Sequence, residues 1–138
     1  MVEQTSKTDT NLILIDELND FSKHSLQVVG SSRREIILLS KTLDPAIYDN
    51  EPFYQGILDF ARGDRNVQVK ILVKDIKPVV EQGHRILNLA RRLSSKIEIR
   101  KLLVKPEKDS ITYLIGERRH LLYMHEDQVY NGFVNYEA

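Results

Sequence analysis

Apolar residues recur at two different spacings along the chain, and these spacings predict its secondary structure. Between residues 16 and 29 they repeat at helical steps, which predicts an amphipathic helix that stops at Gly30. Residues 35–40 form a continuous apolar run that is β-branched at its start, as in a strand buried on both faces. A second helical stripe extends from Phe53 to Ala61 and stops at Gly63. The first half of the chain is therefore predicted to be helix, strand and helix.

The same order continues in the next part of the chain. Residues 67–73 alternate between fully apolar and mixed positions, which predicts a strand with one apolar face. A long apolar stripe from Val79 to Leu93 predicts a third helix whose other face carries arginines. Ile97 and Ile99 indicate a third strand after it. Strands and helices thus alternate three times.

The C-terminal part has the pattern of a hairpin. Residues 111–115 and 120–124 predict two strands, with residues 116–119 as the turn between them. A last short strand is predicted over residues 133–136. These strands follow one another without helices, so they are expected to pair antiparallel.

This order of elements predicts the fold class. Strands that alternate with helices are joined by right-handed crossovers and pair in parallel. We therefore expect a single α/β domain over residues 11–138, with a mixed, largely parallel sheet flanked by helices and a C-terminal antiparallel hairpin. The polar residues 1–10 lack periodicity and are expected to form a flexible tail.

Composition narrows the functional classes. The chain has no cysteine, which excludes disulfide scaffolds, thiolate metal sites and catalytic thiols. No apolar run approaches the roughly 18 residues that cross a bilayer, and the first ten residues lack the features of a signal peptide. A cytoplasmic protein without membrane insertion is expected.

The net charge of zero conceals a segregation of charge along the chain. Residues 1–61 carry 5 basic and 10 acidic side chains, residues 62–119 carry 15 and 7, and residues 120–138 carry 3 acidic side chains and no Lys or Arg. If the basic side chains of the middle block share a face, they form a surface for a phosphate-bearing partner. Alternatively, the block forms an ordinary solvated face or is neutralised by the acidic segments.

Polar residues follow each of the three predicted parallel strands. Ligands in open α/β sheets bind beyond the carboxyl ends of the strands, where Asp44, Asp75 and Arg100 are expected. His84 and Arg85 begin the helix after Asp75 and are expected at the same rim. Two carboxylates with a histidine and an arginine can perform acid–base chemistry. The alternative is structural: turns, a helix cap and a solvated arginine.

Sequence motifs for metals and cofactors are missing. The four histidines are scattered and show no HExxH or comparable spacing. Neither GxGxxG nor GxxxxGK[ST] occurs, so nucleotide binding by a glycine-rich phosphate loop is not expected. We expect no metal and no cofactor.

Nucleic acid is a candidate partner because of the basic block. Arg91, Arg92, Lys96 and Arg100 are expected around one helix–strand corner, and Tyr113 and Tyr123 are candidates for stacking on bases. No helix-turn-helix, zinc-finger or RNA-binding signature is present, so contact with the phosphate backbone is the form of binding that the sequence allows.

Three motifs resemble a known family. LDPAIYD (43–49), VKD (73–75) and GHRILNLARRLSS (83–95), in this order of strands and helices, resemble the phospholipase D-like domains. Within these, the chain is similar to a small bacterial family that stands alone or is appended to acetyltransferase-like proteins. The resemblance covers residues 33–136 and implies a mixed α/β fold, pairing as a homodimer across the site face, and a groove with affinity for phosphates.

The resemblance fails at the catalytic motif. Active phospholipase D-like enzymes carry His-x-Lys-x-x-x-x-Asp, in which the histidine is the nucleophile. The corresponding hairpin here reads DSITYLIGERRHLLYM (109–124), and no histidine in the chain satisfies the motif. Hydrolysis by that mechanism is therefore not expected. In the narrower family, the matched positions form a candidate binding site: Asp44, Tyr48, Asp75, His84, Arg85, Arg91, Arg92 and Arg100.

Three functions follow from these observations. The first is a non-catalytic phospholipase D-like module, dimeric, that binds a phosphate-bearing ligand or the backbone of nucleic acid. The second is an enzyme whose site is built on Asp44, Asp75, His84 and Arg85. The third is a regulatory subunit that binds a protein partner.

Overall fold

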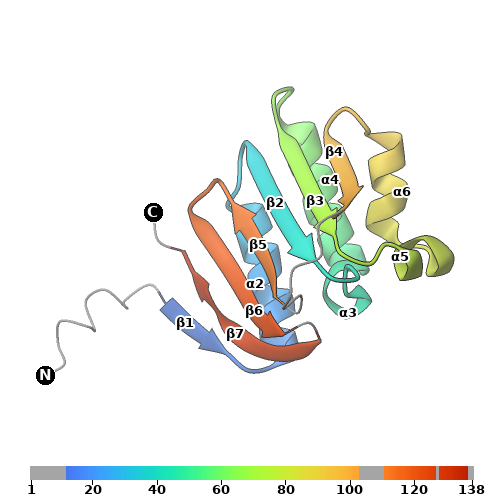
Figure 1. Cartoon of the computed structure of the whole chain (residues 1–138). Helices are drawn as coiled ribbons and strands as arrows, with labels where there is room; N and C mark the ends of the chain where they lie inside the picture. Colours follow the sequence, from blue (N-terminus) through green and yellow to red (C-terminus); the bar gives the residue numbers. More distant parts are fainter. Residues whose placement is uncertain (1–11, 103–110, 127, 137–138) are drawn as a thin grey trace, which may run out of the picture.

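The chain folds into one layer of helices on one mixed β-sheet (Figure 1). The computed structural model describes residues 12–102, 111–126 and 128–136. The strands are β1 (Leu12–Ile15), β2 (Glu35–Ser40), β3 (Gln68–Val73), β4 (Ile97–Lys101), β5 (Thr112–Gly116), β6 (His120–Glu126) and β7 (Val129–Asn135). The helices are α2 (Leu18–Gly30), α3 (Pro45–Tyr48), α4 (Glu51–Gly63), α5 (Lys77–Gln82) and α6 (Arg85–Arg92).

The sheet has the strand order β1-β7-β6-β5-β2-β3-β4. Among the described strands, only β2, β3 and β4 pair in parallel, and the other four pairings are antiparallel. The single mixed α/β domain is confirmed, but the expectation of a largely parallel sheet was wrong. Parallel neighbours need a crossover helix, whereas β5, β6 and β7 are joined by short turns and can pair only antiparallel.

The helices cover one face of the sheet. The steps from β2 to β3 and from β3 to β4 go in the same direction, so right-handed crossovers place α4 and α6 on the same side. Helix α2 packs beside α4, and both lie behind the sheet in Figure 1. Along β2 the side chains alternate between buried and half-buried. The expectation that residues 35–40 are buried on both faces was therefore wrong for the described residues, and the helices expected to flank the sheet lie on one of its faces.

Most of the predicted elements are confirmed. The helices that end at Gly30 and Gly63, the three parallel strands and the hairpin with its turn at residues 117–119 are present. The third predicted helix is divided into α5 and α6. Gly83 interrupts it with a left-handed φ of 81°, a conformation that glycine adopts without strain. The helix then restarts at Arg85, where the His84 side chain caps it.

Two elements lie outside the predictions. Strand β1 occupies residues that were assigned to no element, and α3 forms a short turn of helix behind Asp44. The last strand is also longer than predicted, because β7 begins at Val129 and not at Phe133. The expected flexible tail, residues 1–10, lies outside the described residues.

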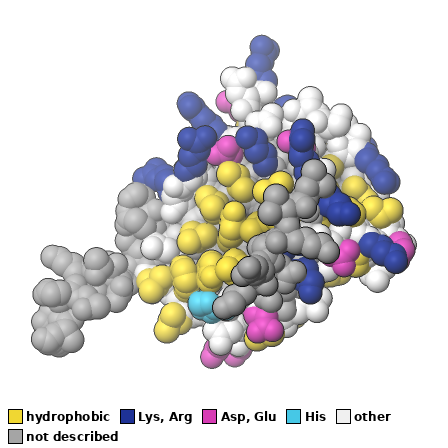
Figure 2. All heavy atoms as spheres, viewed as in Figure 1, with side chains coloured by type: hydrophobic (Ala, Val, Ile, Leu, Met, Phe, Trp, Pro, Cys, Tyr) yellow, Lys and Arg dark blue, Asp and Glu magenta, His cyan; other side chains and the backbone are white. Residues whose placement is uncertain are grey.

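The second face of the sheet carries a row of apolar side chains. The strand register aligns one residue from each strand across the whole sheet: Leu14, Phe133, Tyr123, Tyr113, Leu39, Leu72 and Arg100. Figure 2 views this face, with hydrophobic side chains at its centre and Lys and Arg side chains around its upper and right edges. We call this surface the open face.

Candidate functional site

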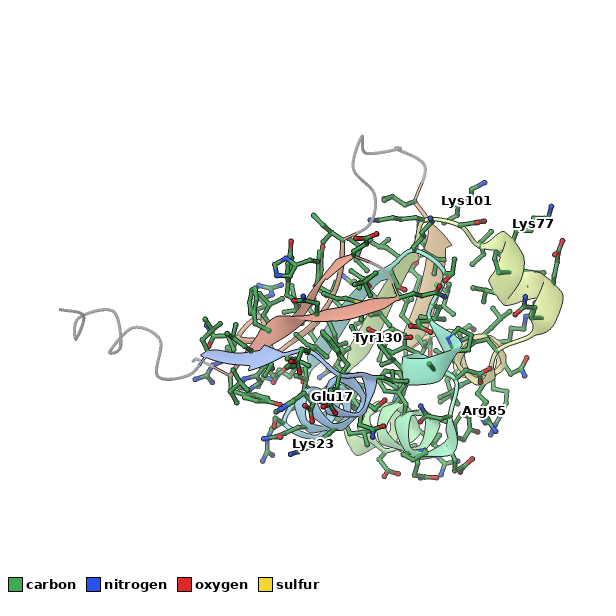
Figure 3. The ribbon with its side chains drawn as sticks, turned by 90° about the horizontal axis from the view of Figure 1, so that it is seen from below. Glu17, Lys23, Lys77, Arg85, Lys101 and Tyr130 are labelled. Atoms are coloured by element: carbon green, nitrogen blue, oxygen red, sulfur yellow. The ribbon has the colours of Figure 1, made fainter. Side chains whose placement is uncertain are left out.

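The carboxyl ends of β2, β3 and β4 form the rim where a site was predicted. Asp44 lies there but is only 4% exposed. Its carboxylate caps α3 by accepting a hydrogen bond from the Ala46 amide (3.0 Å) and accepts a second one from the Tyr130 hydroxyl (2.7 Å). Asp44 therefore joins β7 to the loop after β2. Figure 3 looks onto this end of the molecule, with Tyr130 nearer its centre than Lys77 or Lys101.

His84 is buried beside the same loop. Its Nδ1 accepts a hydrogen bond from the Ile86 amide (3.1 Å), so its Nε2 donates to the Leu43 carbonyl (3.0 Å). Burial lowers the pKa of the His84 imidazole from its ordinary 6.5 and outweighs the Asp49 carboxylate, which raises it. Both ring nitrogens of a neutral imidazole are thus used in fixing α6 to the loop.

The loop itself is strained between these contacts. Leu43 is fully buried and has a left-handed φ of 58°, and its amide is held by the Ser40 hydroxyl at 2.9 Å. Thr42 Oγ1 is the buried side-chain oxygen that has no hydrogen-bond partner within the described ranges. A left-handed leucine costs on the order of 1–3 kcal/mol, so the bonds from Ser40 and His84 hold the loop against that strain.

The neutral state of His84 predicts a dependence of stability on pH. The unfolded chain protonates this histidine below about pH 6.5, whereas the folded chain resists protonation. Unfolding then takes up a proton, so the free energy of unfolding should fall as the pH drops from about 7 to about 5. Burial lowers the pKa of His24 in the same direction, so two histidines contribute.

Urea denaturation at a series of pH values measures this slope. We expect His84→Asn to make the slope shallower while His24 retains its part of it. His125 is exposed on β6, and His125→Asn is the matched control for the loss of one imidazole. Equal slopes in the wild type and His84→Asn would contradict the neutral buried imidazole.

The other predicted residues at this rim also make contacts within the fold. Tyr48 is buried on α3, with its ring edge-on to Phe53 at 5.1 Å. Arg85 donates from its guanidinium to the backbone carbonyl (3.0 Å) and the carboxylate (3.2 Å) of Asp49. Asp75 is exposed in the turn before α5, where it accepts from the Lys77 amide at 3.3 Å. The acid–base site built on Asp44, Asp75, His84 and Arg85 stays a prediction.

The predicted arginines are divided between the two ends of the sheet. Helix α6 runs antiparallel to the strands, so it begins with Arg85 at the carboxyl end and ends with Arg91 and Arg92 at the amino end. Arg92 donates to the Tyr54 hydroxyl (3.0 Å). Arg100 lies on β4 with its Nη2 2.6 Å from Glu98 Oε2. Of the four cations expected at one corner, Arg91, Arg92 and Lys96 therefore lie together at the amino end of β4, whereas Arg100 lies near its carboxyl end.

Most of the cations gather at the amino end of the parallel strands. We call this surface the basic end, and its described cations come from the loop before β2, the ends of α4 and α6 with the loops that follow them, and the β5–β6 turn. These cations are Arg33, Arg34, Arg62, Arg65, Arg91, Arg92, Lys96, Arg118 and Arg119. The described carboxylates at this end are Glu35, Asp59, Asp64 and Glu117. Figure 2 shows the dark blue side chains along this upper edge.

The carboxyl end has the opposite balance. Its described basic residues are Lys41, Lys74, Lys77, Arg85 and Lys101, and its acidic residues are Asp16, Glu17, Asp44, Asp49, Glu51, Asp75, Glu81 and Glu126. The basic end thus has nine cations against four carboxylates, and the carboxyl end has five against eight. The segregation seen along the sequence becomes a segregation between the two ends of one sheet.

Glu117 fixes the turn that carries two of these arginines. Its carboxylate accepts hydrogen bonds from the Arg34 amide (2.8 Å) and the Glu35 amide (3.0 Å). Burial raises the pKa of Glu117, but the backbone amides outweigh this and hold the pKa below its ordinary 4.5. Arg118 donates to the Glu35 carboxylate at 2.9 Å. The β5–β6 turn is therefore tied to the start of β2.

Two hollows meet at Arg34. One, of about 700 Å³, lies between the ends of α2 and α4 and is lined by Arg33, Gly30 and Asp64 among others. The second, of about 420 Å³, lies between the starts of β2 and β3 and the β5–β6 turn. Within the described part of the chain, the side chains of Arg33, Arg65 and Arg119 form no hydrogen bond or ion pair, and all three are exposed. These charges are available to a ligand.

The aromatic residues predicted to stack on bases lie elsewhere. Tyr113 and Tyr123 are paired across β5 and β6 on the open face. The Tyr123 ring stacks on Phe133 with centroids 5.0 Å apart and an interplanar angle of 21°. One face of the Tyr123 ring is thus already covered by Phe133.

The described residues have neither a metal-binding cluster nor a helix that could cross a membrane. They contain no group of three or more His, Cys, Asp or Glu side chains arranged to hold a metal ion. None of the helices in the described ranges is long and apolar enough to cross a membrane.

Comparison with known proteins places the chain in a family. Residues 17–138 match the model of a domain of unknown function, DUF7931. The chain belongs to the DUF7931 family. None of the curated proteins matches the sequence of this DUF7931 chain.

A solved structure shares the fold of the DUF7931 domain. The similar structure is that of TrmBL2, an archaeal chromatin protein described as showing a novel mode of DNA binding. The TM-score is 0.61 at 18% sequence identity, over 96% of this chain and 51% of TrmBL2. The DUF7931 chain therefore spans about half the length of TrmBL2, and the likeness is one of fold.

The sequence carried a signal for the basic end that the prediction missed. Arg33, Arg34 and Arg65 lie between the end of a helix and the start of a parallel strand, and Arg62 lies in the last turn of α4. All such connections meet at the amino end of a parallel sheet, just as all strand-to-helix connections meet at the carboxyl end. The helix dipole favours cations at the C-terminal end of any helix, so a single arginine there does not indicate a ligand site. Four arginines at two such helix-to-strand connections do indicate a basic surface at the amino end of the sheet.

Proposed function

We propose that this chain is a non-catalytic phospholipase D-like module that binds the phosphate backbone of nucleic acid through its basic end. The observation that carries the proposal is the gathering of nine cations against four carboxylates at this end, with Arg33, Arg65 and Arg119 unpaired among the described residues. Nucleic-acid backbones attract such surfaces without reading sequence. The DNA binding described for TrmBL2, which shares the fold, supports this class of ligand.

The shape of the basic end also suits a backbone ligand. Its cations come from four separate connections, so they are spread along an edge of the sheet and not gathered around one small anion. The two hollows at Arg34 indent this edge, and each is lined by two arginines and two carboxylates. The homodimer implied by the phospholipase D-like resemblance stays a prediction, as does a protein partner.

The proposal is tested by a salt titration. We expect fluorescence anisotropy to show binding of the full chain to labelled single- and double-stranded DNA and RNA at low salt. If about six phosphates are contacted, the affinity for duplex DNA should fall on the order of 10³-fold between roughly 50 and 200 mM salt. Little difference is expected between unrelated sequences, because backbone contacts carry no sequence information.

Two results would overturn parts of the proposal. No binding at the lowest salt would remove nucleic acid as the ligand. Shortened oligonucleotides recovered after the titration and separated on a gel would show cleavage, which a non-catalytic module does not perform. Heat-denatured protein serves as the control for binding by an unfolded basic chain.

A further inference from the structure

We propose that a second copy of this chain pairs with the free edge of β1, so that one sheet continues through both copies. Strand β1 is the outer strand of the sheet on one side and, among the described strands, hydrogen-bonds only to β7. Its other edge presents backbone donors and acceptors outside this pairing, and the chemistry that satisfies such an edge is another β-strand. This surface is separate from the basic end.

Strand β1 exposes apolar side chains on both faces of the sheet. Leu12 is 36% exposed, Ile13 43% and Leu14 80%. Ile13 is paired with Val134 and so lies on the helix face, whereas Leu14 is paired with Phe133 and lies on the open face. A partner that covered one face of the sheet would leave either Ile13 or Leu14 in water. A strand added at the edge of β1 gives both side chains a neighbour.

The opposite edge of the sheet shows how an unpartnered edge is protected. Strand β4 carries Glu98, Arg100 and Lys101, and charged side chains on an edge strand discourage pairing with other chains. Strand β1 carries the sequence Leu-Ile-Leu-Ile, without a charge, proline or bulge. The two edge strands of the described sheet thus differ: β4 carries charges that discourage pairing, whereas β1 carries none and can pair with another strand.

The sequence of β1 matches its own copy. When two identical strands pair antiparallel, a twofold axis relates them, and an axis at Ile13 places Ile13 opposite Ile13 of the second copy. Leu12 then lies opposite Leu14 of the second copy, and no charge meets a like charge. Registers centred beyond Ile15 bring Asp16 and Glu17 of the two copies together and are disfavoured by repulsion.

The size of this contact sets its strength. Four residues of strand form a contact below the ~1,200 Å² of a standard interface, so the dimer should dissociate on dilution. The twofold axis is perpendicular to the sheet and places the two basic ends at opposite ends of the dimer. Each copy then binds nucleic acid independently, so this inference can fail while the proposed function holds, and the reverse.

Sedimentation velocity of the full chain over a range of concentrations is the first test. We expect the mass to rise from 16.0 kDa toward twice that value with concentration. Ile13→Lys should leave a monomer at every concentration. Val80→Lys is the matched control, because Val80 is 54% exposed on α5 and away from this edge, and it should dimerise as the wild type does. A wild type that stays monomeric overturns the proposal and leaves the edge for a strand of another protein.

Engineered cysteines test the register. The chain has no cysteine of its own, so one substitution introduces a unique thiol. Cα atoms of directly opposite residues lie about 4.5–5.5 Å apart, within reach of a disulfide, so Ile13→Cys should cross-link under mild oxidation. In this register the two copies of residue 14 lie roughly 8 Å apart, too far for a disulfide, so Leu14→Cys should not cross-link. Cross-linking of neither variant, or of Leu14→Cys alone, contradicts the pairing centred at Ile13.

Discussion

Replacing Arg33, Arg65 and Arg119 together with alanine is expected to weaken nucleic-acid binding at low salt on the order of 10²–10³-fold. The three arginines come from three different connections at the basic end, and their side chains form no hydrogen bond or ion pair with described residues. Removing them should therefore leave the fold intact and remove about three phosphate contacts. The slope of the logarithm of affinity against the logarithm of salt concentration should become shallower by roughly 2.7 for duplex DNA.

The matched control removes the same charge from the other end of the sheet. Lys41, Lys77 and Lys101 are cations of the carboxyl end, so the triple alanine variant also lowers the net charge by three. A strand of six residues separates the two ends by about 20 Å. This is about twice the screening length of ~10 Å at 0.1 M salt, so the affinity should change by no more than about threefold.

The comparison of the two variants distinguishes the site from a general effect of charge. Thermal melts and the anisotropy titration are made on both proteins under the same conditions. Equal losses would show that only net charge matters, and a larger loss in the lysine variant would place the ligand at the carboxyl end. The second result would favour the rim that contains Asp44 and Arg85.

The local elements could be predicted because their signals are local. The stripe of α4, its Asn50 cap and the stop at Gly63 all lie within one stretch of chain. Strand β1 carries no such signal, because four apolar residues fit a strand, a helix or a buried loop equally well. What makes it a strand is its pairing with β7, more than a hundred residues later. The antiparallel half of the sheet depends on the same long-range pairings.

The candidate site shows the same limit. That Asp44, His84 and Arg85 lie close to one loop followed from strand order, and the structure places them there. Their partners did not follow from the sequence. The Tyr130 hydroxyl reaches Asp44 across 86 positions, and the Leu43 carbonyl reaches His84 across 41. These contacts decide how much of each side chain is left for a ligand.

Charge along the sequence was informative only after the directions of the elements were known. The basic block at residues 62–119 includes Arg91 at one end of the sheet and Arg85 at the other, six positions apart. The eight residues of α6 rise about 12 Å, and Arg85 and Arg91 lie near its opposite ends, so residues of one basic helix belong to different surfaces. Conversely, Arg33 lies outside the block and joins Arg119 at the basic end.

Gly132→Ala is expected to destabilise the fold strongly. Gly132 lies on β7 opposite Met124 of β6, next to an irregularity of the strand pairing between Met124 and Glu126. A Cβ at this position would lie 1.8 Å from the Tyr123 carbonyl oxygen and 3.0 Å from the Met124 Cα. Both are backbone atoms of β6, so the two strands would have to separate, and β1 pairs with the rest of the sheet only through β7. Overpacking of this kind costs about 3 kcal/mol of unfolding free energy.

Gly63→Ala provides the control for the loss of a glycine. Gly63 ends α4, has no left-handed φ, and an added Cβ meets nothing within 4 Å. Alanine there restricts the unfolded chain and should leave the stability unchanged or raise it by up to about 1 kcal/mol. A loss of about 3 kcal/mol in Gly132→Ala corresponds to a melting temperature lower by roughly 10 °C. If Gly132→Ala had the same melting temperature as Gly63→Ala, β6 and β7 would not approach each other at Tyr123 as described. The strand pairing that joins β1 to the sheet would then need to be reassigned.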